Sequence, residues 1–143
     1  MTVPPKIVLD SNVVHAGLRS SRGASFRLLQ LLGRGRFEIV LSVPLVLEYE
    51  ETLSHLPAEK ALTMKDIDAV IDYLCSVGHE QKIFFLWRPV LRDPDDEIVL
   101  ETAVAGGCAF IVTFNLRDFR GAERFGVRAV TPFQFLKHIG EIP

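Results

Sequence analysis

Four carboxylates in this 143-residue chain are placed where they could bind a metal: Asp10, Glu48, Asp96 and Asp118. Each lies just past a short apolar or turn-forming segment, where a strand ends or a helix begins. Two carboxylates about 4 Å apart repel by about 4 kcal/mol at an effective dielectric constant near 20. A cluster of them is therefore tolerated only when it is protonated or shares a cation. The pattern predicts a Mg²⁺ or Mn²⁺ site.

Short apolar runs that alternate with helical patterns must position these acids. The runs are rich in β-branched residues and lack polar alternation, which is typical of strands buried on both faces of a parallel sheet. The predicted strands are residues 6–10, 37–41, 82–86, 109–113 and 127–130.

Helical periodicity fills the intervals between these runs. The predicted helices are one near Asn12, residues 26–32 ended by Gly33 and Gly35, residues 43–54 capped by Ser42, a helix from the capping box at Thr63 to Gly78, residues 96–105, and a last helix begun by Thr131 and Pro132. Strands separated by helices imply right-handed βαβ units. We therefore expect a single α/β domain over residues 1–143, with three α/β/α layers and a central parallel sheet of about five strands.

Composition excludes several classes of protein. At 48% hydrophobic residues the chain can bury a core, but it has no apolar run of about 18 residues and no signal-peptide pattern. We expect no membrane association and a cytoplasmic location. Cys75 and Cys108 lack the spacing of a disulfide framework or a zinc site, and the four histidines show no metal-ligand spacing.

Ligands of such sheets bind beyond the carboxyl ends of the strands, and this rule selects among the acids. Asp10 directly follows the first strand, where it could also cap the next helix. Ser11 and Asn12 follow it, and Asn12 could hold a ligand or a water in an outer shell. Helical geometry leaves the choice between Glu48 and Glu50 open, because they flank opposite edges of the apolar stripe.

Two further segments supply the remaining candidates. Asp96 begins the buried stripe of its helix and ranks above Asp93 and Asp95, which compete as caps or auxiliary ligands. After the fourth strand, Asn115 and Asp118 have i and i+3 spacing in a predicted helical turn, so both could reach one point. Thr113 and Asn115 are auxiliary candidates in this segment.

Arginine dominates the cations of the chain, although its net charge is −2. Eleven of the sixteen cations are arginines, and this side chain favours bidentate phosphate contacts. The candidates for phosphate contact are Arg19, Arg22, Arg117 and Arg120. A solvated rim is the alternative interpretation for each of them.

Taken in order, these segments resemble the PIN domain family, and in particular the PIN-type toxins of prokaryotic toxin–antitoxin systems. The resemblance runs over nearly the whole chain. It lies in the opening Ile7-Val8-Leu9-Asp10-Ser11-Asn12-Val13, in Leu45-Val46-Leu47-Glu48-Tyr49, in Asp93-Pro94-Asp95-Asp96 with the helix that follows, and in Thr113-Phe114-Asn115-Leu116-Arg117-Asp118-Phe119. It favours Glu48 over Glu50. Ser11 replaces the usual Thr, and Asn115 stands where part of the family has Asp, so we expect Asp118 to supply the last carboxylate.

The resemblance implies a metal-dependent endoribonuclease that uses Mg²⁺ or Mn²⁺ held by Asp10, Glu48, Asp96 and Asp118. It also implies a cognate antitoxin protein and a homodimer. Two alternatives from other classes remain. One is a catalytically degenerate PIN-fold module that binds RNA or protein, and the other is a haloacid-dehalogenase-like phosphatase. The second needs an Asp where Asn12 stands.

Overall fold

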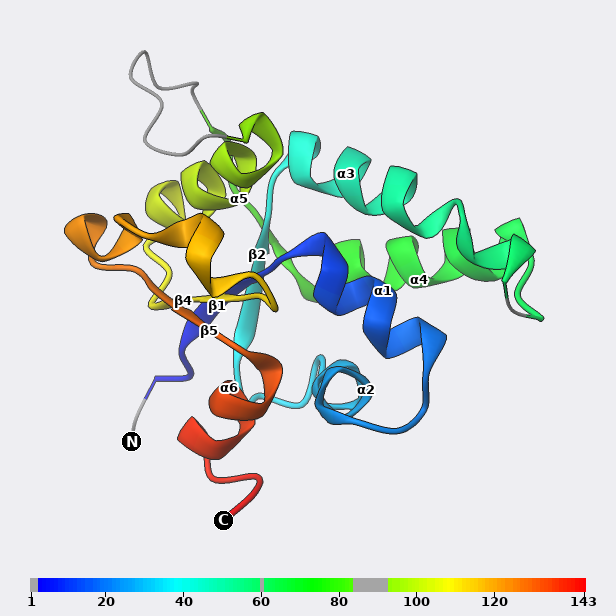
Figure 1. The fold of residues 1–143 in the computed structure, drawn as a ribbon, viewed down its shortest axis with the longest axis horizontal. Helices are drawn as coiled ribbons and strands as arrows, with labels where there is room; N and C mark the ends of the chain where they lie inside the picture. Colours follow the sequence, from blue (N-terminus) through cyan, green and yellow to red (C-terminus); the bar gives the residue numbers. More distant parts are fainter. Residues whose placement is uncertain (1–2, 60, 84–92) are drawn as a thin grey trace.

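The structure is a computed structural model that describes residues 3–59, 61–83 and 93–143. Strands and helices alternate along this part of the chain (Figure 1). In order, the elements are β1 (Lys6–Leu9), α1 (Ser11–Arg19), α2 (Ala24–Gln30), β2 (Glu38–Leu41), α3 (Val43–Leu53), the short 3-10 helix η1 (Leu56–Ala58), α4 (Met64–Val77), β3 (His79–Glu80), α5 (Pro94–Ala105), β4 (Phe110–Val112), the 3-10 helices η2 (Leu116–Phe119) and η3 (Ala122–Phe125), β5 (Arg128–Val130) and α6 (Pro132–His138).

The five strands of the described residues form one parallel sheet in the order β3-β2-β1-β4-β5. β1 is central, with Ile7 paired to Ile39 of β2 and to Phe110 of β4. All the strands run the same way, so their carboxyl ends lie at one edge of the sheet. That edge is where the predicted acids of β1 and β4 must meet.

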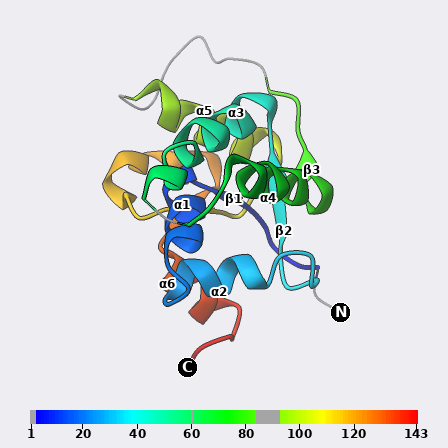
Figure 2. The same ribbon diagram turned by 90° about the vertical axis from the view of Figure 1, so that its right-hand side faces the viewer.

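Helices cover both faces of this sheet. Consecutive residues of β1, β2 and β4 are buried, which requires cover above and below the strands. α5 contacts β1, β2 and β4, while α4 contacts β2. Figures 1 and 2 show α3 beside α5, and α2 beside α6 at the opposite end of the molecule. The predicted three-layer α/β/α class is confirmed.

Side-chain caps begin the helices that carry the candidate acids. The Ser42 hydroxyl accepts a hydrogen bond from the Leu45 amide at 3.3 Å and lies 2.7 Å from the Thr102 hydroxyl, which ties the start of α3 to α5. Asp93 caps α5 by accepting from the Asp95 amide at 2.9 Å. Gly106, just after α5, lies so close to β2 that a Cβ there would come within 2.7 Å of Val40.

The third predicted strand is wrong in position. The sheet is extended by β3, in which His79 and Glu80 pair with Val40 and Leu41. Lys82 and Ile83 are irregular, and residues 84–86 lie outside the described part of the chain. The apolar run that begins at Ile83 suggested a strand, but pairing begins directly after Gly78 ends α4. Both residues of β3 are exposed, so they carry no apolar signal.

Within the described ranges, no helix is long and apolar enough to cross a membrane.

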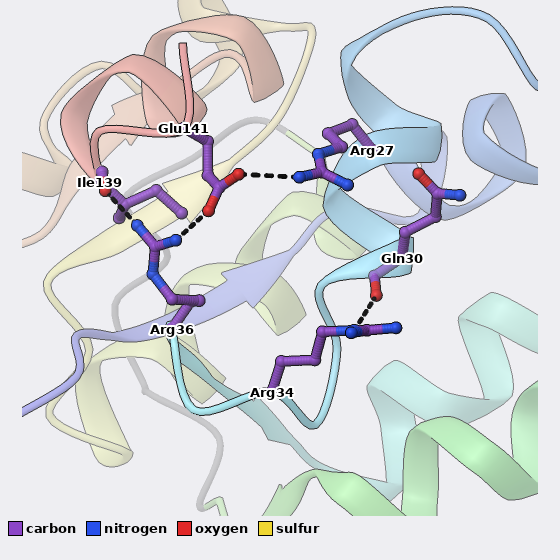
Figure 3. Close-up of polar contacts among 6 residues, drawn as sticks. All are labelled: Arg27, Gln30, Arg34, Arg36, Ile139 and Glu141. Carbon is purple, nitrogen blue, oxygen red and sulfur yellow. Dashed lines mark hydrogen bonds and ion pairs between the residues drawn. The ribbon is translucent and has the colours of Figure 1, made fainter.

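An ion-pair cluster holds the C-terminal turn against the body of the domain (Figure 3). The carboxylate of Glu141 accepts from Arg27 of α2 at 2.9 Å and also pairs with Arg36. Arg36 further donates to the carbonyl of Ile139 at 2.5 Å. The cluster joins α6 to α2 and to the turn before β2.

We expect Glu141→Ala to lower the free energy of unfolding by about 1 kcal/mol, because it leaves two partly exposed guanidinium groups without their carboxylate. Urea denaturation at low ionic strength measures the change, which should shrink in about 1 M NaCl. Arg34→Ala is the control, since Arg34 contacts only the carbonyl of Gln30 among the interactions drawn in Figure 3. Equal stabilities of Glu141→Ala and wild type at low salt would contradict the assignment.

Candidate functional site

Asp10 lies at the carboxyl end of the central strand and is 7% exposed. One carboxylate oxygen accepts from the Ser11 amide at 2.8 Å, and the other accepts from the Thr113 hydroxyl at 2.7 Å. The Asp10 amide donates to the carbonyl of Val112 at 2.9 Å. Asp10 therefore caps α1 and at the same time binds the segment that follows β4. Capping and a role in the site are compatible, because each bond leaves lone pairs on both oxygens.

α3 places Glu48 toward the same edge. Tyr49 is 1% exposed, and its hydroxyl donates to the carbonyl of Leu9 at 2.5 Å. Glu48 is half-buried, whereas Glu50 is exposed. Asp10 and Asp93 act electrostatically on the Glu48 carboxyl. Of the two glutamates, Glu48 is thus the less exposed one, and it lies within electrostatic reach of Asp10.

The first turn of α5 carries three aspartates with different surroundings. Asp93 uses its carboxylate as the helix cap, and Asp95 is exposed. Asp96 is partly buried, and its pKa is raised to about 7 by desolvation first and then by the charges of Asp10 and Asp93. Asp96 is therefore the aspartate of this turn that is coupled most strongly to the buried end of β1.

Asp118 and Asn115 are exposed in the turn after β4. The Asn115 amide donates to the Thr113 hydroxyl at 3.0 Å, and the Asp118 amide donates to the carbonyl of Asn115 at 3.0 Å. Thr113 thus links this turn to Asp10. The charge of Asp118 raises the pKa of both Asp10 and Asp96, so the turn lies within electrostatic reach of the buried acids.

These carboxyls destabilise one another's charged forms. Burial is the largest cause of the raised pKa of Asp10, and the hydrogen bonds from Thr113 and Ser11 oppose it in part. Burial also raises the pKa of Glu48, followed by the charge of Asp95. The charges that act on Asp10, Glu48 and Asp96 in these shifts are all carboxylates. The site is poised to bind a cation or protons.

The donor set suits a hard divalent cation. Within residues 3–59, 61–83 and 93–143, no three His, Cys, Asp or Glu side chains are grouped so that they could hold a metal ion. Mg²⁺, however, commonly uses one or two carboxylates and keeps several waters, so a sparse set of oxygens fits this ion. The side-chain oxygen of Asn12 is buried and has no hydrogen-bond partner in the described structure. Carboxylate and amide oxygens of this kind fit Mg²⁺ or Mn²⁺.

A cavity of about 470 Å³ adjoins Glu48 between α1 and the end of α3. Its lining residues are Ser11, Asn12, His15, Glu48, Glu51, Thr52, His55 and Glu59. Sequence reasoning assigned no histidine to the site, and the separation of His15 from His55 along the chain gives no signal that they line one cavity. Sequence reasoning also gave no sign that the hydroxyl of Tyr49, which follows Glu48 directly, would bind the backbone at the end of β1.

The arginine candidates divide into two groups. Arg117 lies in η2 beside Asp118, and Arg120 follows it directly. Arg19 ends α1, about 13 Å along the helix from Asp10, and Arg22 lies beyond it. All four are exposed. Arg117 and Arg120 are therefore the two candidates that lie in the same turn as Asp118.

Comparison with known proteins identifies the family. A family model described as "PIN domain" matches residues 6–117. The chain belongs to the PIN domain family. The match includes Asp10, Glu48 and Asp96 and ends one residue before Asp118.

A similar fold is also found among solved structures. A chain in the crystal structure of VapBC2 from Rickettsia felis, bound to a DNA fragment from their promoter, aligns with a TM-score of 0.57 and 14% sequence identity. The alignment covers 88% of this chain and 98% of that chain, and at this identity it supports the fold alone. Comparison with curated proteins gives no match.

We expect the metal-free PIN domain to lose stability as the pH rises from about 4 to about 7. The pKa of Asp96 is raised to about 7 in the folded protein, so across this range the folded state keeps a proton that the unfolded chain has already released. Ionisation of Asp96 therefore disfavours folding as the pH rises. Asp96→Asn should therefore be more stable than wild type at about pH 8 by about 1 kcal/mol, a figure reduced for solvent screening because Asp96 is only partly buried.

Urea denaturation with EDTA at about pH 5 and about pH 8 measures this difference. Asp68→Asn, on the exposed face of α4, is the matched control and should change stability by less than about 0.5 kcal/mol at both pH values. A wild-type protein that gains stability between the two pH values would contradict the electrostatic account.

Proposed function

We propose that this PIN domain is a Mg²⁺- or Mn²⁺-dependent endoribonuclease that hydrolyses RNA phosphodiester bonds, and that it is the toxin of a toxin–antitoxin pair. The observation that carries the proposal is that Asp10, at the end of β1, lies within electrostatic reach of Glu48 of α3 and Asp96 of α5, and that burial first and neighbouring carboxylates second raise the pKa of all three. Such an arrangement favours a divalent cation over a free acid cluster.

The proposed metal ligands, direct or through water, are Asp10, Glu48, Asp96 and Asp118. The auxiliary residues are Ser11, Asn12, Asp93, Thr113 and Asn115. When bound, the ion lowers the pKa of a coordinated water and offsets charge on the scissile phosphate. Thr113 and the Ser11 amide fix the orientation of the Asp10 carboxylate. Asp93 holds the first turn of α5 and so fixes the position of Asp96.

RNA binding is proposed to use the cationic side chains nearest the acids. Arg117 and Arg120 are exposed on the turn that contains Asp118 and can contact phosphates there, with Arg19 and Arg22 available only to a longer strand. Such contacts weaken as salt rises. Single-stranded RNA fits this edge better than a duplex, because its backbone can follow a shallow surface.

The proposed partner is an antitoxin protein that covers the acidic edge, and the proposed oligomer is a homodimer in the cytoplasm. Support for the antitoxin comes from the structural neighbour, which is a VapBC2 assembly. Support for the site comes from the neighbouring carboxylates, whose repulsion a cationic partner side chain would relieve in the absence of metal.

We expect Asp10→Asn and Asp96→Asn each to reduce Mn²⁺-dependent RNA cleavage by at least about 100-fold, because each removes a charged oxygen donor. A 5′-labelled single-stranded RNA, incubated with a Mn²⁺ and a Mg²⁺ series, measures the rate. Products should carry 5′-phosphate and 3′-hydroxyl ends. Asp68→Asn serves as the charge-matched control and should cleave at the wild-type rate.

Cleavage that survives both substitutions, or that yields 2′,3′-cyclic phosphates without metal, would contradict the proposal. Wild-type protein that binds neither Mn²⁺ nor Mg²⁺ but still binds RNA or protein would favour the degenerate binding module. That second candidate draws on one observation, the lack of a ready three-ligand set among the described residues. A phosphatase of the haloacid-dehalogenase type has no such support, because Asn12 stands where it needs its second aspartate.

A further inference from the structure

The peptide group between Leu9 and Asp10 is held from both sides. Its amide, which belongs to Asp10, donates to Val112 of β4 at 2.9 Å. Its carbonyl, which belongs to Leu9, accepts from the hydroxyl of Tyr49 at 2.5 Å. Because a peptide group is planar, these two bonds fix the orientation of the backbone that carries the Asp10 side chain.

The bond from Tyr49 replaces one that the sheet does not make. The Ala109 amide donates to the carbonyl of Lys6, and the Asp10 amide donates to the carbonyl of Val112, so the backbone groups of Lys6 and Asp10 that make these bonds point toward β4. In a parallel sheet, the backbone groups of successive residues of a central strand bond alternately to its two neighbours, so the carbonyl of Leu9 points toward β2. The pairing of β1 with β2 ends at Ile7 and Ile39. The carbonyl of Leu9 therefore lies beyond the ladder, where the buried hydroxyl of α3 satisfies it.

The same bond fixes α3 relative to β1. Tyr49 is buried, and its hydroxyl donates to the carbonyl of Leu9. Glu48 precedes Tyr49 on α3, and Asp10 follows Leu9 on β1. One side-chain hydrogen bond thus joins the backbone segments that carry the two carboxylates, over a separation of 40 residues along the chain.

We infer that Tyr49 is a positioning residue for the site. Its hydroxyl fixes the backbone at Asp10 and the position of Glu48 relative to β1, and thereby sets the affinity of the site for the divalent cation. The inference rests on the proposed function for the presence of that cation. Tyr49 is buried, which leaves its side chain no surface for contact with RNA. It acts through the two carboxylates, so its loss should weaken metal binding more than it weakens the fold.

Tyr49→Phe removes the hydroxyl oxygen and keeps the ring. We expect the Kd of the full chain for Mn²⁺, measured by isothermal titration, to rise about tenfold, the size of effect seen when the partner that orients a ligand is lost. The Mn²⁺ concentration for half-maximal RNA cleavage should rise by the same factor. Cleavage at saturating Mn²⁺ should recover toward the wild-type rate.

Tyr73→Phe is the matched control. The Tyr73 hydroxyl also donates to a backbone carbonyl, that of Leu32 at 3.0 Å, but from α4 and away from the acids. Thermal midpoints of both variants should fall, while the Mn²⁺ affinity of Tyr73→Phe stays within about twofold of wild type. If Tyr49 had only a structural role, Tyr49→Phe would lower the thermal midpoint but, like Tyr73→Phe, would keep its Mn²⁺ affinity within about twofold of wild type.

A rescue variant separates the hydroxyl from packing. Tyr49→4-aminophenylalanine keeps a donor at the same place and should bind Mn²⁺ within about threefold of wild type. If Tyr49→Phe binds Mn²⁺ with wild-type affinity, or if the amine does not restore a lost affinity for Mn²⁺, the inference about Tyr49 is overturned and the proposed function is not. Wild-type protein that binds no Mn²⁺ overturns the proposed function as well, so the two failures are distinguishable.

Discussion

The buried carboxylate of Asp10 is the constraint on which the site depends. The parallel register of β1 and β4 brings the Thr113 hydroxyl within 2.7 Å of it, and the start of α1 supplies a second donor. These bonds hold a charge at a place where burial and neighbouring carboxylates oppose it. Folding therefore places carboxyls that disfavour one another's charge at the end of the central strand, and the proposed divalent cation would offset that charge without loss of the hydrogen bonds.

Local patterns predicted most of the fold because its central strands and helix caps depend on nearby residues. Uninterrupted β-branched runs identified β1, β2 and β4, and the caps at Ser42 and Thr63 identified the starts of α3 and α4. The third strand was misplaced because two exposed residues, His79 and Glu80, form it by pairing alone. Strand pairing depends on tertiary structure, and no run of apolar side chains indicates it here.

The candidate site was predictable only in part, for a related reason. A strand end marks Asp10, but helical geometry could not choose between Glu48 and Glu50, since the choice depends on how α3 packs against its neighbours. The hydrogen bond from Tyr49 to Leu9 and the cavity that brings together His15 and His55 arise from helix packing between distant segments. The sequence identified the arginines as candidates for phosphate contact but did not predict where they lie in the fold. Arg19 lies at the far end of α1, away from the acids.

The central claim is that the carboxyl ends of β1 and β4, together with α3 and α5, form a site for one divalent cation. Anomalous diffraction from crystals of the protein grown with Mn²⁺ tests it most directly. The account predicts an anomalous peak within about 2.5 Å of a carboxylate oxygen of Asp10 or Asp96. A well-ordered site with no peak at either carboxylate, in crystals that show bound Mn²⁺ elsewhere on the protein, would contradict it.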